Sequence, residues 1–278
     1  MRDEAVFCPA DDSADRPLDS AAVADAAARE RFVATEFARG PWDPGAQHGG
    51  APAALLMRAL ERLPAADGLT VCRVTYEFLR PVPLGELELR ASVVRPGRRV
   101  QVLEASLLAG EHVEVIRARA LQVQAARAGS GRTALTAPPP GPERGRANDV
   151  RPRYRPMFSL DAIEIRFVAG AFHDRGPATA WFRMRIPLVA GEDASALQLL
   201  AAAGDFGNGI SSLLSWDEYL FINPDLTLYV ERAPAGEWIA VEARTIIPAD
   251  GIGVSEGVLY DERGRVGRAT QALLVAPR

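Results

Sequence analysis

The sequence contains no lysine, and all 32 of its basic residues are arginines. Lysine Schiff-base chemistry, lysine-bound pyridoxal phosphate and a phosphate-binding P-loop all need that side chain, so the sequence excludes them. No apolar run approaches the ~20 residues that a membrane-spanning helix needs. The N-terminus carries several acids and lacks the apolar segment of a signal peptide. We therefore expect a cytoplasmic protein that does not associate with membranes.

Cysteine and histidine are scarce as well. Two cysteines and three scattered histidines are too few for a disulfide framework or a structural zinc site, so we expect neither a metal nor a cofactor. The net charge of -4 gives no surplus of positive charge for binding nucleic acid. The chain of 278 residues is 48% hydrophobic and 24% charged, which is ordinary globular composition with enough apolar material for two average domains or one large one.

The chain divides into two parts around a stretch rich in proline, glycine and arginine at 125–156. This stretch has no hydrophobic periodicity and several breakers of helices and strands, which predicts a structureless linker between domains. The predicted organisation is a flexible or helical lead-in over 1–30, with a candidate helix over 20–31, then an N-terminal domain over 31–124, the linker, and a C-terminal domain over 157–278.

The two parts resemble each other at a constant offset of 152 residues. The segment that begins at Thr75 aligns with the one that begins at Thr227. Strand-like segments near residues 87, 102 and 121 align at the same offset with those near 239, 254 and 273. The offset holds over about 50 residues without a gap, which indicates an internal repeat.

Each half shows the same order of elements. An extended segment, seen as period-two alternation over 180–186, precedes one helical stretch. In the first half, Ala53, Leu56, Leu60 and Leu63 fall on one helical face, and the partner helix is predicted over 195–215. Strands follow, separated by turns at 95–97, 108–111, 233–236 and 262–264. One long helix followed by a meander of strands predicts an α+β fold in which a sheet wraps the helix.

The first candidate site is the segment Gln47-His48-Gly49-Gly50, directly before the first helix. Glycines leave backbone N–H groups accessible at the positive end of the helix dipole, which is how an oxyanion hole is built. The alternative is a tight loop with glycine at positive φ, in which His48 is only a cap.

The second candidate is Asp205, which interrupts the apolar second helix. A carboxylate among leucines, alanines and a phenylalanine is unfavourable unless it is hydrogen-bonded, and such an acid suits a general base. The alternative is that Asp205 lies on a solvated face or caps a short helix that begins near Phe206.

Two amides form the third candidate. Gln271 interrupts the late strand of the second half, and a buried amide there needs partners. Asn223 precedes Pro224 and Asp225. The alternatives are an outward-facing strand position for Gln271 and a simple turn before proline for Asn223.

Taken together, these features resemble the double-hotdog acyl-CoA thioesterases, and most of all the bacterial TesB-like branch. The resemblance covers roughly 30–124 and 157–276. It is carried by the segments GPWDP and QHGG in the first half and by PLVAGEDAS, DFGNG and INPDLT in the second. It implies two hotdog domains in one chain, packed as a pseudo-dimer with a continuous antiparallel sheet.

The resemblance also implies an activity, acyl-CoA hydrolysis by general-base activation of water. Asp205 matches the family's catalytic aspartate and Gln271 its glutamine. Asn223 stands where the family has a threonine, and its amide, with one acceptor and two donors, can still hold a water molecule. His48, Gly49 and Gly50 would bind the substrate and its oxyanion. Acyl-CoA is the expected partner, with arginines at its phosphates, and a homo-oligomer of such chains is compatible with the family.

The repeat predicts a single composite site per chain. At the offset of 152, Ala53 aligns with Asp205, Val71 with Asn223 and Arg119 with Gln271. None of these counterparts can hold and deprotonate a water molecule. Two other functions stay open: a non-catalytic acyl-CoA-binding module, which the departure at Asn223 favours, and an enoyl-CoA hydratase or dehydratase, which normally needs a histidine near the aspartate.

Overall fold

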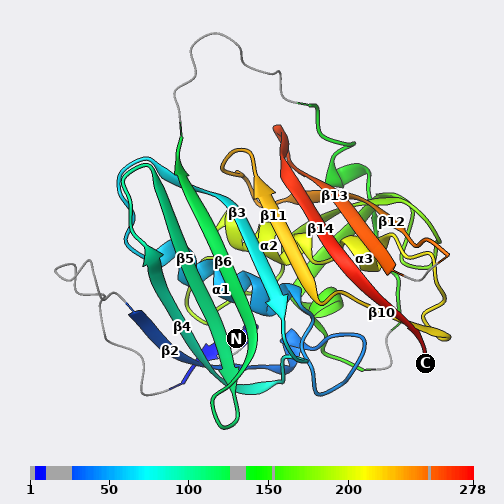
Figure 1. Cartoon of the computed structure of the whole chain (residues 1–278). Helices are drawn as coiled ribbons and strands as arrows, with labels where there is room; N and C mark the ends of the chain where they lie inside the picture. Colours follow the sequence, from blue (N-terminus) through cyan, green and yellow to red (C-terminus); the bar gives the residue numbers. More distant parts are fainter. Residues whose placement is uncertain (1–3, 11–26, 126–135, 152–153, 250–251) are drawn as a thin grey trace.

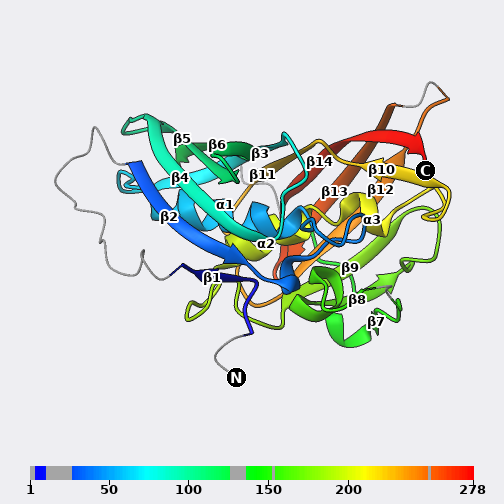
Figure 2. The same cartoon turned by 90° about the horizontal axis from the view of Figure 1, so that it is seen from below.

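The dominant feature of the computed structural model is one antiparallel sheet that curls around a buried pair of helices (Figures 1 and 2). The structure describes residues 4–10, 27–125, 136–151, 154–249 and 252–278. The fold is α+β, as the sequence predicts, with the helices on the concave side of the sheet (Figure 2).

The strands of the first half are β1 (Phe7–Pro9), β2 (Ala27–Ala34), β3 (Leu69–Phe78), β4 (Gly85–Arg95), β5 (Val100–Ala109) and β6 (Val113–Gln124). Those that follow are β7 (Arg146–Ala147), β8 (Ile163–Ala169), β9 (Ala178–Met184), β10 (Tyr219–Ile222), β11 (Asp225–Val230), β12 (Ile239–Ile246), β13 (Ile252–Asp261) and β14 (Gly264–Pro277). The helices are α1 (Gly50–Arg62), α2 (Ala196–Gly204) and α3 (Gly207–Ile210), with the shorter helical segments η1 (Glu36–Ala38), η2 (Pro142–Arg144) and η3 (Phe158–Ala162).

The two halves meet where β3 pairs with β11 (Figure 1). Outward from this junction the strand order is β3-β6-β5-β4-β2 on one side and β11-β14-β13-β12-β9 on the other, so corresponding strands occupy corresponding places. Thr75 lies opposite Thr227 in the register, and their hydroxyl oxygens are 3.2 Å apart. The two residues that the sequence repeat aligns are therefore paired with each other.

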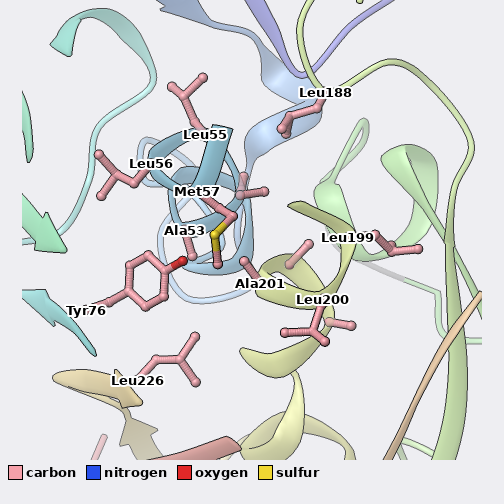
Figure 3. Close-up of a cluster of buried hydrophobic side chains, with 14 of the residues drawn as sticks. Ala53, Leu55, Leu56, Met57, Tyr76, Leu188, Leu199, Leu200, Ala201 and Leu226 are labelled. Atoms are coloured by element: carbon pink, nitrogen blue, oxygen red, sulfur yellow. The ribbon is translucent and has the colours of Figure 1, made fainter. Parts of the chain in front are cut away.

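The helices α1 and α2 form the centre of the core. Every residue of α1 from Gly50 to Leu60 is buried, so this helix is enclosed on all sides. Figure 3 shows Ala53 and Met57 of α1 close to Ala201 and Leu200 of α2, and small alanine side chains allow the two helices to pack closely. Tyr76 reaches this contact from β3.

Two secondary-structure predictions need correction. The candidate helix over 20–31 is wrong for 27–31, which belong to β2, while 20–26 lie outside the described residues. Pairing of β2 with β4 along its whole length outweighs the helical propensity of this alanine-rich segment. The second helix ends at Gly204 rather than running to residue 215, and the short helix α3 follows after Asp205 and Phe206.

The prediction of a structureless linker over 125–156 is wrong for the short elements η2 and β7. Residues 136–151 lie against the second half, because β7 pairs with β8. The carbonyl oxygen of Pro140 accepts a hydrogen bond of 2.7 Å from Nε1 of Trp181. This segment covers the outer face of β9, which explains why Trp181 and Phe182 are both buried although they point to opposite faces. The domain boundaries themselves stay predictions.

Candidate active site

Asp205 lies at the break between α2 and α3 and is only 6% exposed. Glycines on both sides of it make this geometry accessible. A Cβ atom on Gly204 would lie 2.6 Å from Cδ2 of Leu228, and one on Gly207 would lie 3.2 Å from Oε1 of Gln271. Close packing against β11 and β14 therefore fixes the end of α2 and directs Asp205 between the two halves.

Two amides hold one oxygen of this carboxylate. Nδ2 of Asn223 donates to Oδ1 of Asp205 at 2.9 Å, and Nε2 of Gln271 lies 3.3 Å from the same atom. Nε2 of Gln271 also donates to the backbone oxygen of Asp205 at 3.1 Å. The backbone N–H of Asn208 donates to Oε1 of Gln271 at 3.1 Å, so the orientation of the Gln271 amide is determined on both sides.

The second carboxylate oxygen faces the start of α1, which comes from the other half of the chain. Nδ1 of His48 lies 3.1 Å from Oδ2 of Asp205. A Cβ atom on Gly49 would lie 2.8 Å from Oδ2 and 2.9 Å from Cζ of Phe78. Only glycine at position 49 leaves this side of the carboxylate unobstructed.

The imidazole of His48 is held by aromatic side chains. Its ring stacks on Phe206 with centroids 4.3 Å apart and lies 5.4 Å from the ring of Phe158. Nδ1 accepts a hydrogen bond of 3.1 Å from the backbone N–H of Gly50. Within the described residues, the N–H of Gly49 has no hydrogen-bond acceptor. The start of α1 therefore presents one N–H group without an acceptor, at Gly49, and one that donates to His48, at Gly50, beside the carboxylate.

The structure brings together all six residues that the sequence suggests: Asp205, Asn223, Gln271, His48, Gly49 and Gly50. Their catalytic roles stay predictions. Asn223 combines both interpretations offered for it, because it lies in the turn between β10 and β11 and its amide also donates to the backbone oxygen of Asp225 at 3.1 Å.

Sequence reasoning missed two features of this site. It assigned His48 to the substrate and its oxyanion and did not predict the direct contact between the side chains of His48 and Asp205 across the halves. It also gave no role to Asn208, whose N–H orients Gln271 and whose Nδ2 donates to the carbonyl oxygen of Phe221 at 2.7 Å. The only signal for Asn208 was its place in the segment DFGNG.

Two of the predicted counterparts in the first half are wrong by a shift in register. Thr75 pairs with Arg119 in the first half, whereas Thr227 pairs with Thr270 in the second, so the offset between the last strands of the two halves is 151. The counterpart of Gln271 is therefore the buried Ala120 rather than Arg119. In the helices the N-caps are Gly49 and Ser195. That offset of 146 places Ala59, not Ala53, opposite Asp205. The corrected counterparts are also unable to activate water.

Two cavities lie elsewhere in the molecule. One, of about 870 Å³, lies near the N-terminus of α2 and is lined by Ile186, Leu199 and Arg185 among others. The other, of about 450 Å³, lies beside Phe32 and His112. Neither is lined by the residues around Asp205, so the site is identified by its hydrogen bonds rather than by a cavity.

Across the part of the chain that the structure describes, no group of acidic, histidine or cysteine side chains could hold a metal ion, and no helix is long and apolar enough to span a membrane.

Comparison with known proteins identifies the fold first. A protein from Alicyclobacillus acidocaldarius, described as having a hot dog fold and unknown function, superposes with a TM-score of 0.70 at 16% identity, covering 89% of this chain and 93% of that chain. The tesB protein of Mycobacterium avium subsp. paratuberculosis and the acyl-CoA thioesterase II TesB2 of Mycobacterium marinum both superpose with a TM-score of 0.63 at 15% identity. They cover 89% and 90% of this chain, each matched over 93% of its own length. The chain thus has a hot dog fold.

The family follows from sequence comparison. The sequence model for the N-terminal domain of acyl-CoA thioesterases matches residues 38–123, and the model for the C-terminal domain matches residues 121–275. The chain belongs to the acyl-CoA thioesterase family and is a thioester hydrolase. A search of curated protein sequences returned no match.

Proposed function

We propose that this chain is a tandem of two hotdog units, packed as a pseudo-dimer, which hydrolyses an acyl-CoA to a free acid and CoA at one composite site. The equal strand orders on the two sides of the β3–β11 junction and the pairing of Thr75 with Thr227 support the duplicated architecture. The contact between Asp205 of the second half and His48 of the first supports one site built from both units.

The observation that carries the proposed reaction is the unequal environment of the two Asp205 oxygens. Oδ1 is held by the amides of Asn223 and Gln271, whereas Oδ2 receives neither. Oδ2 is therefore the oxygen that accepts the proton of a water molecule, and the amides keep it aimed at that water. A positioned general base of this kind contributes about 10²–10⁴ to the rate.

The start of α1 is the proposed oxyanion site. The free N–H of Gly49 and the N–H of Gly50 lie at the positive end of an enclosed helix, beside Oδ2 of Asp205. Attack of the activated water on the thioester carbon moves charge to the carbonyl oxygen, and N–H donors at that point stabilise it. One lost donor of this kind costs about 10²–10³ in turnover. CoA leaves as a thiol, and the reaction needs no covalent intermediate with the protein.

A second candidate is hydration of an enoyl-CoA. The contact of 3.1 Å between His48 and Asp205 favours it, because that chemistry pairs an aspartate with a histidine. The geometry favours it less than hydrolysis, since Nδ1 of His48 faces the N–H of Gly50 and Oδ2 of Asp205 rather than an open site. A non-catalytic acyl-CoA-binding module is the third candidate.

A panel of acyl-CoA thioesters from six to sixteen carbons, together with one enoyl-CoA, separates the three functions. We expect release of free thiol with at least one saturated substrate. Loss of enoyl absorbance without thiol release would instead show a hydratase. Saturable binding without either change would show a binding module. Both of these results contradict the proposal.

A further inference from the structure

Nδ1 of His48 has two neighbours that make opposite demands on it. The N–H of Gly50 donates to it at 3.1 Å, which requires an unprotonated nitrogen with a free lone pair. Oδ2 of Asp205 lies 3.1 Å away and is itself an acceptor, so a hydrogen bond between these two atoms requires a proton on one of them. A single ring nitrogen can satisfy only one neighbour at a time.

Two arrangements follow from this competition. With Nδ1 unprotonated and Asp205 ionised, the N–H of Gly50 is occupied by the imidazole. With a proton on Nδ1, the imidazole donates to Oδ2 and no longer accepts from Gly50, so that N–H group becomes available to another acceptor. The protonation of His48 thus determines whether the first turn of α1 offers one free donor, at Gly49, or two.

We propose that His48 receives the proton that Asp205 removes from water, and that this transfer releases the N–H of Gly50 to the developing oxyanion. The proposal rests on the proposed function, with His48 as a positioning and proton-holding residue that acts through its two neighbours. It couples activation of the nucleophile to completion of the oxyanion site.

The proton balance of the cycle is closed. As the oxygen of water bonds to the thioester carbon, its proton passes to Oδ2 of Asp205 and on to Nδ1 of His48, while the electrons of the C=O double bond move to oxygen. When the tetrahedral intermediate collapses, the C–S bond breaks. The proton then returns from Nδ1 through Oδ2 to the sulfur, and the N–H of Gly50 rebinds Nδ1. The products are a carboxylic acid and CoA thiol.

The surroundings of His48 suit a transient proton holder. The imidazole ring packs against Phe206 and Phe158, and the His48 side chain is 12% exposed, so the ring is held in place with little contact with solvent. Oδ2 of Asp205 lies 3.1 Å from Nδ1, so the carboxylate that delivers the proton is also within reach for its return.

Two substitutions separate this role from simple packing. In His48→Asn the new side-chain oxygen can accept from the N–H of Gly50, two residues on, but it cannot take up a proton. In His48→Ala the N–H of Gly50 is free, yet no proton acceptor remains. We expect the kcat for thiol release to fall by about 10²-fold or more in both variants, measured on protein that circular dichroism shows to be folded. Added imidazole should restore part of the kcat of His48→Ala and none of that of His48→Asn.

Two outcomes would overturn the proposal. One is a kcat for folded His48→Asn within about threefold of wild type, because the loss expected for a missing proton acceptor is far larger. The other is that imidazole has no effect on the kcat of folded His48→Ala. Asp205→Asn, assayed in parallel, distinguishes the two levels of the argument. If that variant is inactive while His48→Asn is active, only the relay fails. If Asp205→Asn keeps its turnover, the proposed function itself fails.

Discussion

Gly49→Ala tests whether the space beside the Asp205 carboxylate is needed for activity. The added Cβ would lie 2.8 Å from Oδ2 of Asp205 and 2.9 Å from Cζ of Phe78, whereas ordinary contact begins near 3.4 Å. The carboxylate must therefore move by about 0.6 Å, and a shift of that size along its bond of 2.9 Å from Asn223 would stretch that bond to about 3.5 Å, the outer limit of a hydrogen bond. Since a displacement of about 1 Å in a catalytic group costs about 10²-fold, we expect turnover to fall by about 10- to 100-fold.

Folding should suffer much less than activity in this variant. Overpacking costs about 1–3 kcal/mol, but the three atoms that meet the new methyl group belong to the side chains of Asp205 and Phe78, which can shift. Thiol release and thermal unfolding, measured on the same preparation, separate the two effects.

Two neighbouring glycines supply the comparison. On Gly50 a Cβ would meet the backbone oxygen of Ala202 at 2.6 Å, so Gly50→Ala should lose stability as well as activity. On Gly45 it would lie 3.4 Å from its nearest neighbour, so Gly45→Ala should change neither. If Gly49→Ala retains turnover within about twofold of Gly45→Ala, against the large loss expected for misplacement, the carboxylate is not aimed at the reacting atoms as we infer.

Three further predictions concern stability and stoichiometry. Burial alone would raise the pKa of Asp261, but hydrogen bonds from Arg232 and from two backbone N–H groups outweigh burial and lower that pKa. The ionised Asp261 therefore stabilises the fold fully above the unfolded pKa of about 4, and this stabilisation is lost as the pH falls through the lowered pKa of the folded state. Urea unfolding of Asp261→Asn against wild type should show a gap that closes with falling pH; a gap independent of pH contradicts this. Among the residues that the structure describes, the fully buried hydroxyl of Tyr76 has no hydrogen-bond partner, and burial raises its pKa. Tyr76→Phe should therefore increase the free energy of unfolding by about 1 kcal/mol, and a loss of stability would show a missed partner. Calorimetric titration with a non-hydrolysable acyl-CoA analogue should give one equivalent per chain, because Ala59, Val71 and Ala120 offer no second site; two equivalents would refute the asymmetry.

The sequence predicts the architecture well where the repeat is intact. The offset of 152 aligns strands β3 to β5 with β11 to β13, and the pairing of Thr75 with Thr227 follows from it. It fails by one residue in the last strand and by six in the helix. The register shifts between Val71 and Arg73 where β3 pairs with β6, and between Leu259 and Tyr260 where β13 pairs with β14. Such irregularities cannot be predicted from a pattern of hydrophobic residues.

The members of the candidate site could be predicted from the sequence, but the contact between His48 and Asp205 could not. Polar side chains in apolar segments single out Asp205 and Gln271, and glycines at a helix start single out Gly49. The contact between His48 and Asp205 joins positions 157 residues apart, and it depends on how α1 and α2 lie against each other, which local patterning does not encode. For the same reason the role of the Asn208 N–H, a backbone group, has no side-chain signature.

Asp205→Asn tests the central claim most directly. The new amide can keep its oxygen toward Asn223 and Gln271 and turn its NH₂ toward His48, so the hydrogen bonds survive and a largely buried charge is removed. We expect unchanged or slightly increased thermal stability. Thiol release from the best acyl-CoA substrate should fall by about 10²–10⁴-fold, whereas Asp193→Asn, an exposed aspartate beyond the other end of α2, should behave as wild type. A fall of less than about tenfold in folded Asp205→Asn would show that Asp205 is not the base.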